Sequence, residues 1–278
     1  MDNATLRRIY ERAALCRAFE EECARRVDTK DVTIPVYLST GQEYIPATIS
    51  VWCEDKGIQP QVFIQHRGHS QYLAFGGDLD ALVLELLGDL RGCSGGMGGS
   101  ASIQSKEASI YGHDGLMGSQ APIAVGACYG NRKPTICFAG DAAAEEDYFL
   151  AALGWAATQQ LPILFVVEDN GLSILTEKRV RRSWSIVEVA RGFGMPGLYM
   201  KDDPEEMLRW LLPIERWPML INIDTTRLRW HAGAGVDNPN AFDRHAEVSK
   251  QFNPGEVAKV HLRAETLVRE AWARHCVK

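Results

Sequence analysis

The chain has 278 residues, 46% of them hydrophobic, and a formal net charge of −6. This length supports one large α/β domain or two small ones, and the mild acidity argues against nucleic acid as the main partner, which would require a basic face. Seven scattered cysteines without a CxxC pair, and no apolar segment of the signal-peptide or transmembrane type, predict a cytoplasmic protein with reduced thiols that does not enter a membrane.

The first predicted elements are two helices. Residues 3–28 form an amphipathic pattern whose apolar side carries Leu6, Ile9 and Phe19, and we expect it to pack against the core or against a partner chain. A second helix is expected to open at Gly41-Gln42-Glu43. Gln42 and Glu43 either line a ligand cleft or start the helix, and the pattern leaves both readings open.

Residues 61–103 combine a strand, a helix and a glycine-rich loop. The strand, Val62 to Gln65, delivers His66-Arg67-Gly68-His69 to its carboxyl end. A buried helix is expected from Leu79 to Leu87, and residues 92–100 (GCSGGMGGS) form the loop. An arginine at a strand end offers a rigid fork of donors to phosphate oxygens. A single histidine there is either functional or a satisfied core residue.

Residues 111–130 (YGHDGLMGSQAPIAVGACYG) are rich in glycine and other small residues. Glycines at 112, 115, 118 and 126 allow the backbone to approach a flat ligand closely. The run from Ala121 to Cys128 predicts a helix of small residues that can pack tightly beneath such a ligand.

Residues 134–174 are the centre of the predicted fold, and they have a strand–helix–strand pattern. Thr135–Ala139 and Ile163–Val167 are apolar runs typical of buried parallel strands, and the helix is expected from Glu145 to Gln160. Asp141 follows the first strand and Asn170 the second. One right-handed crossover would bring their side chains together at the carboxyl edge, where Mg²⁺ or Ca²⁺ could be held jointly with a phosphate. Alternatively, Asp141 caps the helix and Asn170-Gly171 is an ordinary turn.

The remaining chain continues the α/β pattern. A basic cluster (Lys178, Arg179, Arg181 and Arg182) is interpreted as a solvated face, with steering of an anionic substrate as the alternative. The acids Glu145, Glu146 and Asp147 are expected to point to solvent or to a partner. A helix is expected from residue 203, a last strand over Met219–Ile223, and a C-terminal amphipathic helix over Asn253–His275.

Four segments of the chain resemble segments that occur in the same order in the alpha subunits of the E1 components of 2-oxo acid dehydrogenases. GDA, the crossover helix and DN are similar to the thiamine-diphosphate motif GDG…NN. The segment from HRGH to GCSGGMGGS resembles the family's R-x-H-G site and glycine-rich loop. GHDGLMG resembles the loop that holds the aminopyrimidine ring, and RWHAGAG resembles R-Y-H-G-H-S, although its G-H-S part is absent here.

The resemblance implies a doubly wound, mostly parallel α/β sheet with the thiamine-diphosphate-binding fold. We expect a single domain over residues 1–278, with the N-terminal helix at 3–28, the α/β core at about 34–235 and a helical tail at 240–278. It also implies thiamine diphosphate and Mg²⁺ as cofactors. The metal would be held by Asp141, Asn170 and the Leu172 carbonyl, and the diphosphate by Arg67 and the N–H groups of Ala142 and Ala143. The aminopyrimidine would be held by main-chain groups of Gly115 and Met117.

By the same resemblance three histidines are candidate catalytic residues. His69 would face the reacting carbon of the cofactor, and His231 takes the place of the family's active-site histidine. His113 stands where the family often has a small residue, and it is either a substrate-specific group or a surface histidine.

The function implied is that of an alpha subunit in a two-chain enzyme that decarboxylates a 2-oxo acid or cleaves a ketose-like carbonyl substrate. The family's pyrimidine-activating glutamate lies on the beta subunit, so an α2β2 assembly is expected, with a lipoyl E2 protein as a further partner. Two alternatives remain: a split transketolase-like or acyloin-forming transferase, and a degenerate non-catalytic subunit that binds a partner.

Overall fold

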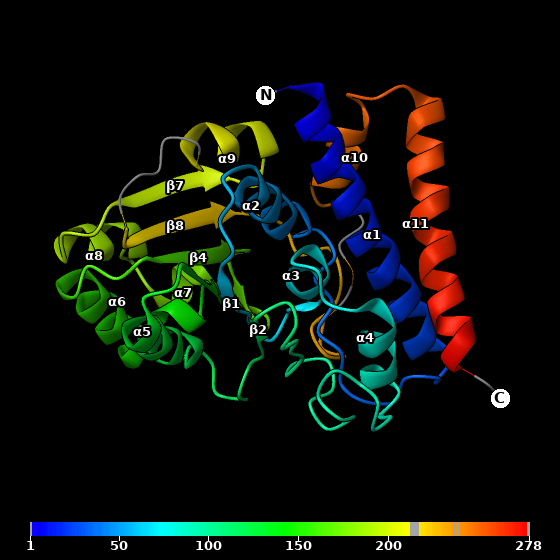
Figure 1. Cartoon of the computed structure of the whole chain (residues 1–278), viewed down its shortest axis with the longest axis horizontal. Helices are drawn as coiled ribbons and strands as arrows, with labels where there is room; N and C mark the ends of the chain where they lie inside the picture. The colour runs from blue at the N-terminus through cyan, green and yellow to red at the C-terminus, as the bar shows by residue number, and fades with distance from the viewer. Residues whose placement is uncertain (1, 212–216, 236, 238–239, 277–278) are drawn as a thin grey trace.

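The computed structural model describes residues 2–211, 217–235, 237 and 240–276, and a six-stranded sheet lies at its centre (Figure 1). The strand order is β2–β1–β3–β4–β8–β7, and all neighbouring strands are parallel. The strands are β1 (Gln61–Phe63), β2 (Ile110–Tyr111), β3 (Thr135–Gly140), β4 (Ile163–Asp169), β7 (Gly197–Lys201) and β8 (Met219–Asp224). The predicted parallel α/β sheet is confirmed.

Side chains of the central strands alternate between two hydrophobic cores, one on each face of the sheet. Ile136 and Phe138 enter the first core, whereas Cys137 enters the second. The first core is formed with α1 (Asn3–Asp28), α2 (Tyr44–Asp55), α3 (His69–Ala74), α4 (Leu79–Leu86), α9 (Pro204–Leu211), α10 (Arg244–Ser249) and α11 (Pro254–His275). The second is formed with α5 (Gln120–Asn131), α6 (Asp147–Thr158) and α8 (Ile186–Gly192). Helices on both faces make the fold doubly wound, as predicted.

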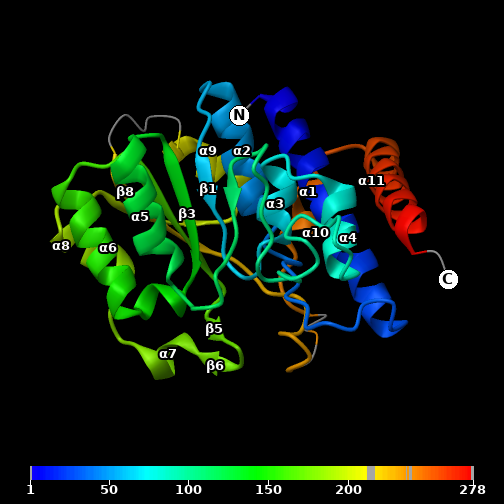
Figure 2. The ribbon, with the colours of Figure 1, turned by 60° about the horizontal axis from the view of Figure 1, so that its bottom comes forward.

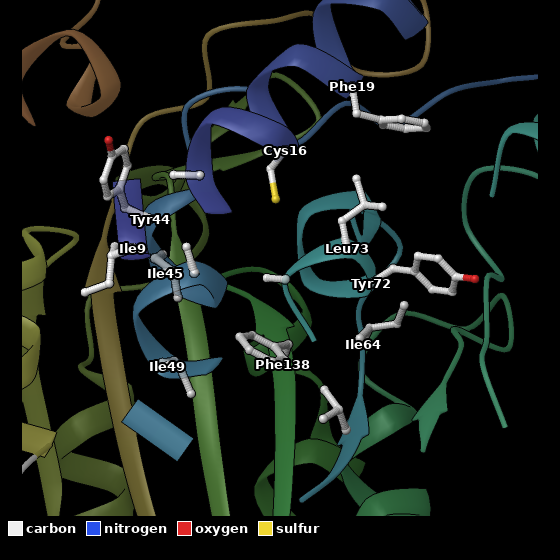
Figure 3. Close-up of a cluster of buried hydrophobic side chains, with 14 of the residues drawn as sticks. Ile9, Cys16, Phe19, Tyr44, Ile45, Ile49, Ile64, Tyr72, Leu73 and Phe138 are labelled. Carbon is white, nitrogen blue, oxygen red and sulfur yellow. The ribbon is translucent and has the colours of Figure 1, made fainter. Parts of the chain in front are cut away.

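Helix α1 packs on the core along its length, which confirms one of the two expectations for residues 3–28. Its start is capped by Asp2, whose carboxylate accepts a hydrogen bond from the Thr5 N–H at 2.6 Å. Figure 3 shows Cys16 and Phe19 of α1 above α2 and α3, where the labelled side chains are apolar and buried. Helix α11 lies beside α1 (Figure 1).

The structure differs from the predicted elements at several places, and two of these differences bear on the site. The helix expected from Glu145 is a 3₁₀ turn, η1 (Ala143–Glu145), followed by α6 from Asp147. Glu146 separates them because its backbone is extended, with φ −66° and ψ 141°. Helix α3 was not predicted, since its first three residues are polar although the helix is completely buried.

All seven cysteines carry free thiols, and five of them are buried, as the sequence predicted. Within the part of the chain that the structure describes, none of the helices combines the length and the apolar character that crossing a bilayer demands.

The glycine-rich loop at residues 92–100 folds around an internal carboxylate, that of Glu85 on α4. Its Oε2 accepts hydrogen bonds from the N–H groups of Ser94 (2.7 Å) and Gly96 (2.9 Å), and its Oε1 from Gly98 (2.8 Å) and Gly99 (3.0 Å). Consecutive backbone donors of this kind form an anion-binding nest. In this protein the anion is a side chain of the chain itself, so the loop is a structural element that supports the site.

Close packing explains two of the glycines in this loop. A Cβ atom at Gly92 would lie 2.5 Å from the Glu85 carboxylate, and one at Gly98 would lie 2.2 Å from the Ser102 carbonyl oxygen. The loop ends at Ser100, whose hydroxyl oxygen lies 2.9 Å from Nε2 of His69. The nest around Glu85 therefore also fixes a neighbour of the HRGH segment.

We predict that Glu85→Ala lowers the free energy of unfolding by about 3 kcal/mol, because four backbone donors lose a charged acceptor in a partly buried loop. Denaturant unfolding of the purified chain measures the effect. Glu107→Ala is the matched control, since Glu107 is exposed and its truncation should change stability by less than about 0.5 kcal/mol. Equal effects of the two substitutions would contradict the prediction.

Candidate active site at the carboxyl edge of the sheet

The predicted site residues lie where the chain reverses its path through the sheet. From β1 the chain proceeds outward to β2, whereas from β3 it proceeds in the opposite direction to β4. Ligands of open parallel sheets bind in the crevice at such a switch point. The segment after β1 carries His66 and Arg67, and the one after β3 carries Asp141. The topology thus brings both segments to the place where a ligand is expected.

Asp141, Asn170 and Leu172 lie together at the ends of neighbouring strands. In the register of β3 and β4, Gly140 pairs with Glu168, so Asp141 and Asn170 follow within two residues. Leu172 begins a hairpin of two short strands, β5 (Leu172–Ser173) and β6 (Thr176–Glu177). Its N–H donates to the Asn170 amide oxygen at 3.1 Å. The structure assembles the three residues, and their metal-binding role stays a prediction.

The carboxylate of Asp141 is buried and ion-paired within the chain. Arg181, the last residue of α7 (Lys178–Arg181), donates to it and also pairs with Glu145 at 2.5 Å. Burial raises the pKa of Asp141 to about 6, and the nearby Asp169 carboxylate adds to this rise, whereas Arg181 opposes it.

The interpretation of residues 178–182 as a solvated face is wrong for three of the four basic side chains. Arg181 and Arg182 are 13% and 4% exposed, and both pair with Glu145, Arg182 at 3.4 Å. Lys178 pairs with the buried Asp169 at 2.5 Å. Arg179 is 80% exposed and fits the interpretation. Because Glu145 is held by these arginines, it does not point to solvent as expected.

The residues expected to bind the diphosphate have suitable geometry. Arg67 is buried and donates to the Leu38 carbonyl, and among the described residues it forms no ion pair with a carboxylate. Burial lowers its pKa to about 10, and Arg227 contributes to the same effect. Ala142 has φ −74° and ψ −36°, so alanine replaces the glycine at the third position of the GDG motif without left-handed strain.

The loop expected to contact the aminopyrimidine packs on the turn that follows Asp141. Gly115 has φ +100°, and its N–H donates to Nδ1 of His113 at 2.9 Å. The Met117 carbonyl accepts a hydrogen bond from the Tyr148 hydroxyl. A Cβ atom at Gly118 would lie 2.7 Å from the Ala143 carbonyl oxygen. The loop therefore lies next to the diphosphate residues, and its contact with a ring stays a prediction.

Three histidines converge beside these loops, and we call them the histidine cluster: His66, His113 and His231. The ring of His66 lies 5.8 Å from each of the other two, between centroids, and Tyr37 packs edge-on against His66 and His231. Because Nδ1 of His113 accepts the Gly115 N–H, its Nε2 carries the proton. This Nε2–H is buried and has no hydrogen-bond partner among the described residues.

The histidine cluster is electrically neutral at neutral pH. Burial lowers the pKa values of all three rings, that of His231 to about 4. The positive charge of Arg67 adds to this effect at His66 and His231, and that of Arg227 at His231. Neutral imidazoles each offer one N–H donor and one lone-pair acceptor, so the cluster is suited to hydrogen bonding with a polar ligand.

The structure does not bring His69 to this group. Its ring is completely buried, with Nδ1 3.1 Å from the Glu20 carboxylate and Nε2 2.9 Å from the Ser100 hydroxyl. It starts α3 and packs edge-on against Phe19 of α1. Its expected position opposite a cofactor and its catalytic role both stay predictions.

Two further residues of the site were not assigned from the sequence. His66 precedes the turn into α3, whereas His69 is inside the helix, and this boundary decides which histidine reaches the cluster. For Gln42 the sequence leaves open whether it lines a ligand cleft or starts a helix. It is buried, accepts a hydrogen bond from the Asn170 amide at 3.2 Å and donates to Glu168 at 3.4 Å, which places it under the expected metal site. Glu43 instead pairs with Arg17.

Comparison with known proteins shows what the chain is similar to. The family model "Dehydrogenase E1 component" matches residues 11–270. The alpha subunit of acetoin:2,6-dichlorophenolindophenol oxidoreductase from Cupriavidus necator is 32% identical over 71% of this chain and 60% of its own length. The pyruvate dehydrogenase E1 component subunit alpha from Zymomonas mobilis is 26% identical over 89% of this chain and 72% of its own. The chloroplastic pyruvate dehydrogenase E1 component subunit alpha-3 from Arabidopsis thaliana is 28% identical over 95% of this chain and 65% of its own length. The chain thus spans about 60% of the length of the first of these relatives.

We predict that His231 titrates near pH 4 and that Arg227→Met raises its pKa by a fraction of a unit, because a nearby positive charge is removed. Imidazole ¹⁵N shifts followed by NMR against pH measure both values. Arg179→Met removes an exposed charge and should leave the titration unchanged. A pKa of His231 at or above the ordinary 6.5 would show that the cluster is not neutral.

Proposed function

This chain belongs to the dehydrogenase E1 component family, and we propose that it is the alpha subunit of a two-chain enzyme that uses thiamine diphosphate and Mg²⁺ to transform a small carbonyl compound. The observation that supports this most directly is the convergence of Arg67 and Asp141 at the switch point of the sheet. Arg67 is a buried cation that forms no ion pair with a carboxylate among the residues the structure describes, and Asp141 is a buried acid beside the amide of Asn170.

The chemistry of these residues fits the cofactor. A buried arginine with no ion pair to the described carboxylates is suited to a diphosphate, which supplies the missing negative charge. One carboxylate, one amide oxygen and one main-chain carbonyl suit Mg²⁺ shared with phosphate oxygens. Among the described residues no group of three or more His, Cys, Asp or Glu is arranged to hold a metal, so the donor set does not favour a transition-metal site.

In the proposed mechanism this chain supplies binding and orientation. Thiamine diphosphate, when bound, supplies a nucleophilic carbon and an electron sink for cleavage next to a carbonyl. Arg67 and the N–H groups of Ala142 and Ala143 hold the diphosphate, and the Gly115–Met117 loop orients the aminopyrimidine. The metal is held by Asp141, Asn170 and the carbonyl of Leu172.

The histidine cluster would contact the substrate. The buried Nε2–H of His113 donates to a substrate oxygen, which satisfies a donor that otherwise lacks a partner. The rings of His66 and His231 stay neutral near pH 7, so each offers one N–H donor and one lone-pair acceptor to the substrate. His69, through Glu20, holds the scaffold behind them.

The relatives suggest the substrate class and the partner. The relatives that this chain matches are named as subunits of pyruvate dehydrogenase and of an acetoin oxidoreductase. We propose pyruvate, another small 2-oxo acid or acetoin as the substrate of this complex. The glutamate that activates the pyrimidine would come from a separate beta subunit, in an α2β2 assembly. A lipoyl E2 protein would then accept the two-carbon unit.

One observation favours a second candidate, a non-catalytic partner-binding subunit. The Asp141 carboxylate is already paired with Arg181, and a permanent ion pair at this residue would exclude the metal. Calorimetry of the assembled complex with thiamine diphosphate and Mg²⁺ separates the two candidates. If the complex binds neither thiamine diphosphate nor Mg²⁺ at saturating concentration, this chain is the non-catalytic subunit.

The split active site is tested by producing this chain alone and together with the product of its neighbouring gene. We expect cofactor-dependent turnover of pyruvate or acetoin by the complex and none by the lone chain, because the pyrimidine-activating group would come from the partner. Turnover by the lone chain would refute the two-chain proposal. Replacement of lipoamide by an aldehyde as the preferred acceptor would instead assign the complex to the acyloin-forming transferases.

We predict that Asp141→Asn weakens binding of thiamine diphosphate with Mg²⁺ about a hundredfold or more, because even the partners of metal ligands contribute about ten- to a hundredfold. Calorimetry of the assembled complex measures the affinity. Asp147→Asn is the matched control, since Asp147 is an exposed acid at the start of α6, and its affinity should be unchanged. Equal affinities of the wild type and Asp141→Asn would remove Asp141 from the metal site.

A further inference from the structure

The ion pair between Arg181 and Asp141 lies at the metal-binding carboxylate of the proposed function. Arg181 reaches this acid from α7, which follows the β5–β6 hairpin and lies with it beyond the edge of the sheet (Figure 2). The same guanidinium pairs with Glu145 at 2.5 Å. We call this arrangement of Arg181 between Asp141 and Glu145 the Arg181 latch.

We propose that Arg181 is the counter-ion that Asp141 exchanges for the divalent cation, so that cofactor loading requires the Arg181 latch to open. This inference rests on the proposed function, because it takes Asp141 as a metal ligand. It adds a competing cation from the chain itself, which makes the position of α7 and the occupancy of the metal site mutually dependent.

Charge balance supports an exchange rather than joint binding. Asp141 and Asp169 are buried beside each other, and Asp169 has its own cation in Lys178. Asp141 therefore needs one further positive charge, which either Arg181 or a metal ion can supply. A guanidinium and a divalent ion at the same carboxylate would repel each other at short range in a region of low dielectric constant.

The latch is incompletely bonded in its present position. Nε of Arg181 and both Nε and one terminal nitrogen of Arg182 are buried without a hydrogen-bond partner among the described residues. Buried donors without acceptors are unfavourable. The closed latch is thus held mainly by its carboxylates, and a competing cation at Asp141 removes one of its two anchors.

The segment that carries the latch buries little apolar surface. Ile174 and Leu175 at the tip of the hairpin are 52% and 57% exposed, and Val180 on α7 is 70% exposed. Strands β5 and β6 have two residues each and pair with each other, not with the main sheet. Because few packed contacts would be lost, this segment can move without disturbing the core.

A latch of this kind lowers the apparent affinity for the cofactor by the fraction of molecules in which it is open. If it is closed for two-thirds to nine-tenths of the time, its removal should tighten binding about three- to tenfold. Arg179 provides a matched control within the same helix, since it is exposed and pairs with Glu177 rather than with the site.

The test is calorimetry on this chain assembled with its partner subunit, as wild type, Arg181→Met and Arg179→Met. Thiamine diphosphate is titrated at fixed Mg²⁺, and inorganic pyrophosphate is titrated without metal. We expect Arg181→Met to bind thiamine diphosphate with Mg²⁺ about three- to tenfold more tightly and Arg179→Met to match the wild type. Pyrophosphate binding without metal should be equal in all three proteins.

Three outcomes would overturn the proposal. Weaker binding by Arg181→Met, of pyrophosphate as well, would mean that Arg181 contacts the phosphate. Equal binding by all three proteins would mean that the ion pair with Asp141 does not compete with the metal. No binding by any of them, including the wild type, would refute the proposed function together with the latch.

A measurement on the wild-type complex does not depend on the folding of a variant. Hydrogen exchange of the backbone amides in residues 178–182 should become faster when Mg²⁺ and thiamine diphosphate are added, because the pair between Arg181 and Asp141 is then broken. Unchanged or slower exchange in this segment would contradict the opening of the latch.

Discussion

Buried carboxylates occur throughout the interior beneath and beside the carboxyl edge of the sheet, and each of them has to be compensated within the protein, because an uncompensated buried charge is strongly destabilising. The compensation is local in each case: Glu20 has His69, Glu43 has Arg17, Glu85 has four backbone N–H groups, Glu168 has glutamine amides, Asp169 has Lys178, and Asp141 has Arg181. These pairs connect α1, the glycine-rich loop, the strand ends and α7 to one another. The positions of the loops at the candidate site therefore depend on the pairing of charges as much as on apolar packing.

This constraint separates the residues that support the site from those that can act in it. His69 has both ring nitrogens engaged inside the first core, so it joins α3 to α1 and to Ser100. His66, three residues earlier, lies outside the helix and faces His113. A histidine with two fixed partners has no free lone pair or proton for a ligand, whereas the Nε2–H of His113 has no hydrogen-bond partner in the part of the chain that the structure describes. Chemical availability, rather than the presence of a histidine in a motif, distinguishes the two roles.

The sequence predicts the central strands of the sheet, their burial and the loops that meet at its edge. It can do so because apolar runs, glycines and the strand–helix–strand spacing are local signals. Asp141 and Asn170 were placed correctly for that reason. The pairing of Arg181 with Asp141 could not be predicted, since it joins residues 40 positions apart and depends on how a short hairpin turns. Four basic residues within five positions are typical of a solvated face, and only the position of α7 shows that three of them turn inward. The nest around Glu85 was missed for a similar reason, because a glycine-rich loop has the same pattern whether its anion is a ligand or a side chain.

The candidate site has two halves of opposite electrostatic need. Beside β1, the buried Arg67 has Arg227 and neutral imidazoles as neighbours and no carboxylate in ion-pair contact among the described residues. Beside β3, the buried Asp141 depends on an arginine from a weakly packed segment. A ligand with only a negative group would satisfy the first half, and a cation alone the second. A metal ion bound to a diphosphate, as in the proposed cofactor, would carry both charges, so it would compensate Arg67 and Asp141 at once. Joint compensation of this kind would make a single chelate a better occupant of the crevice than either an anion or a cation by itself.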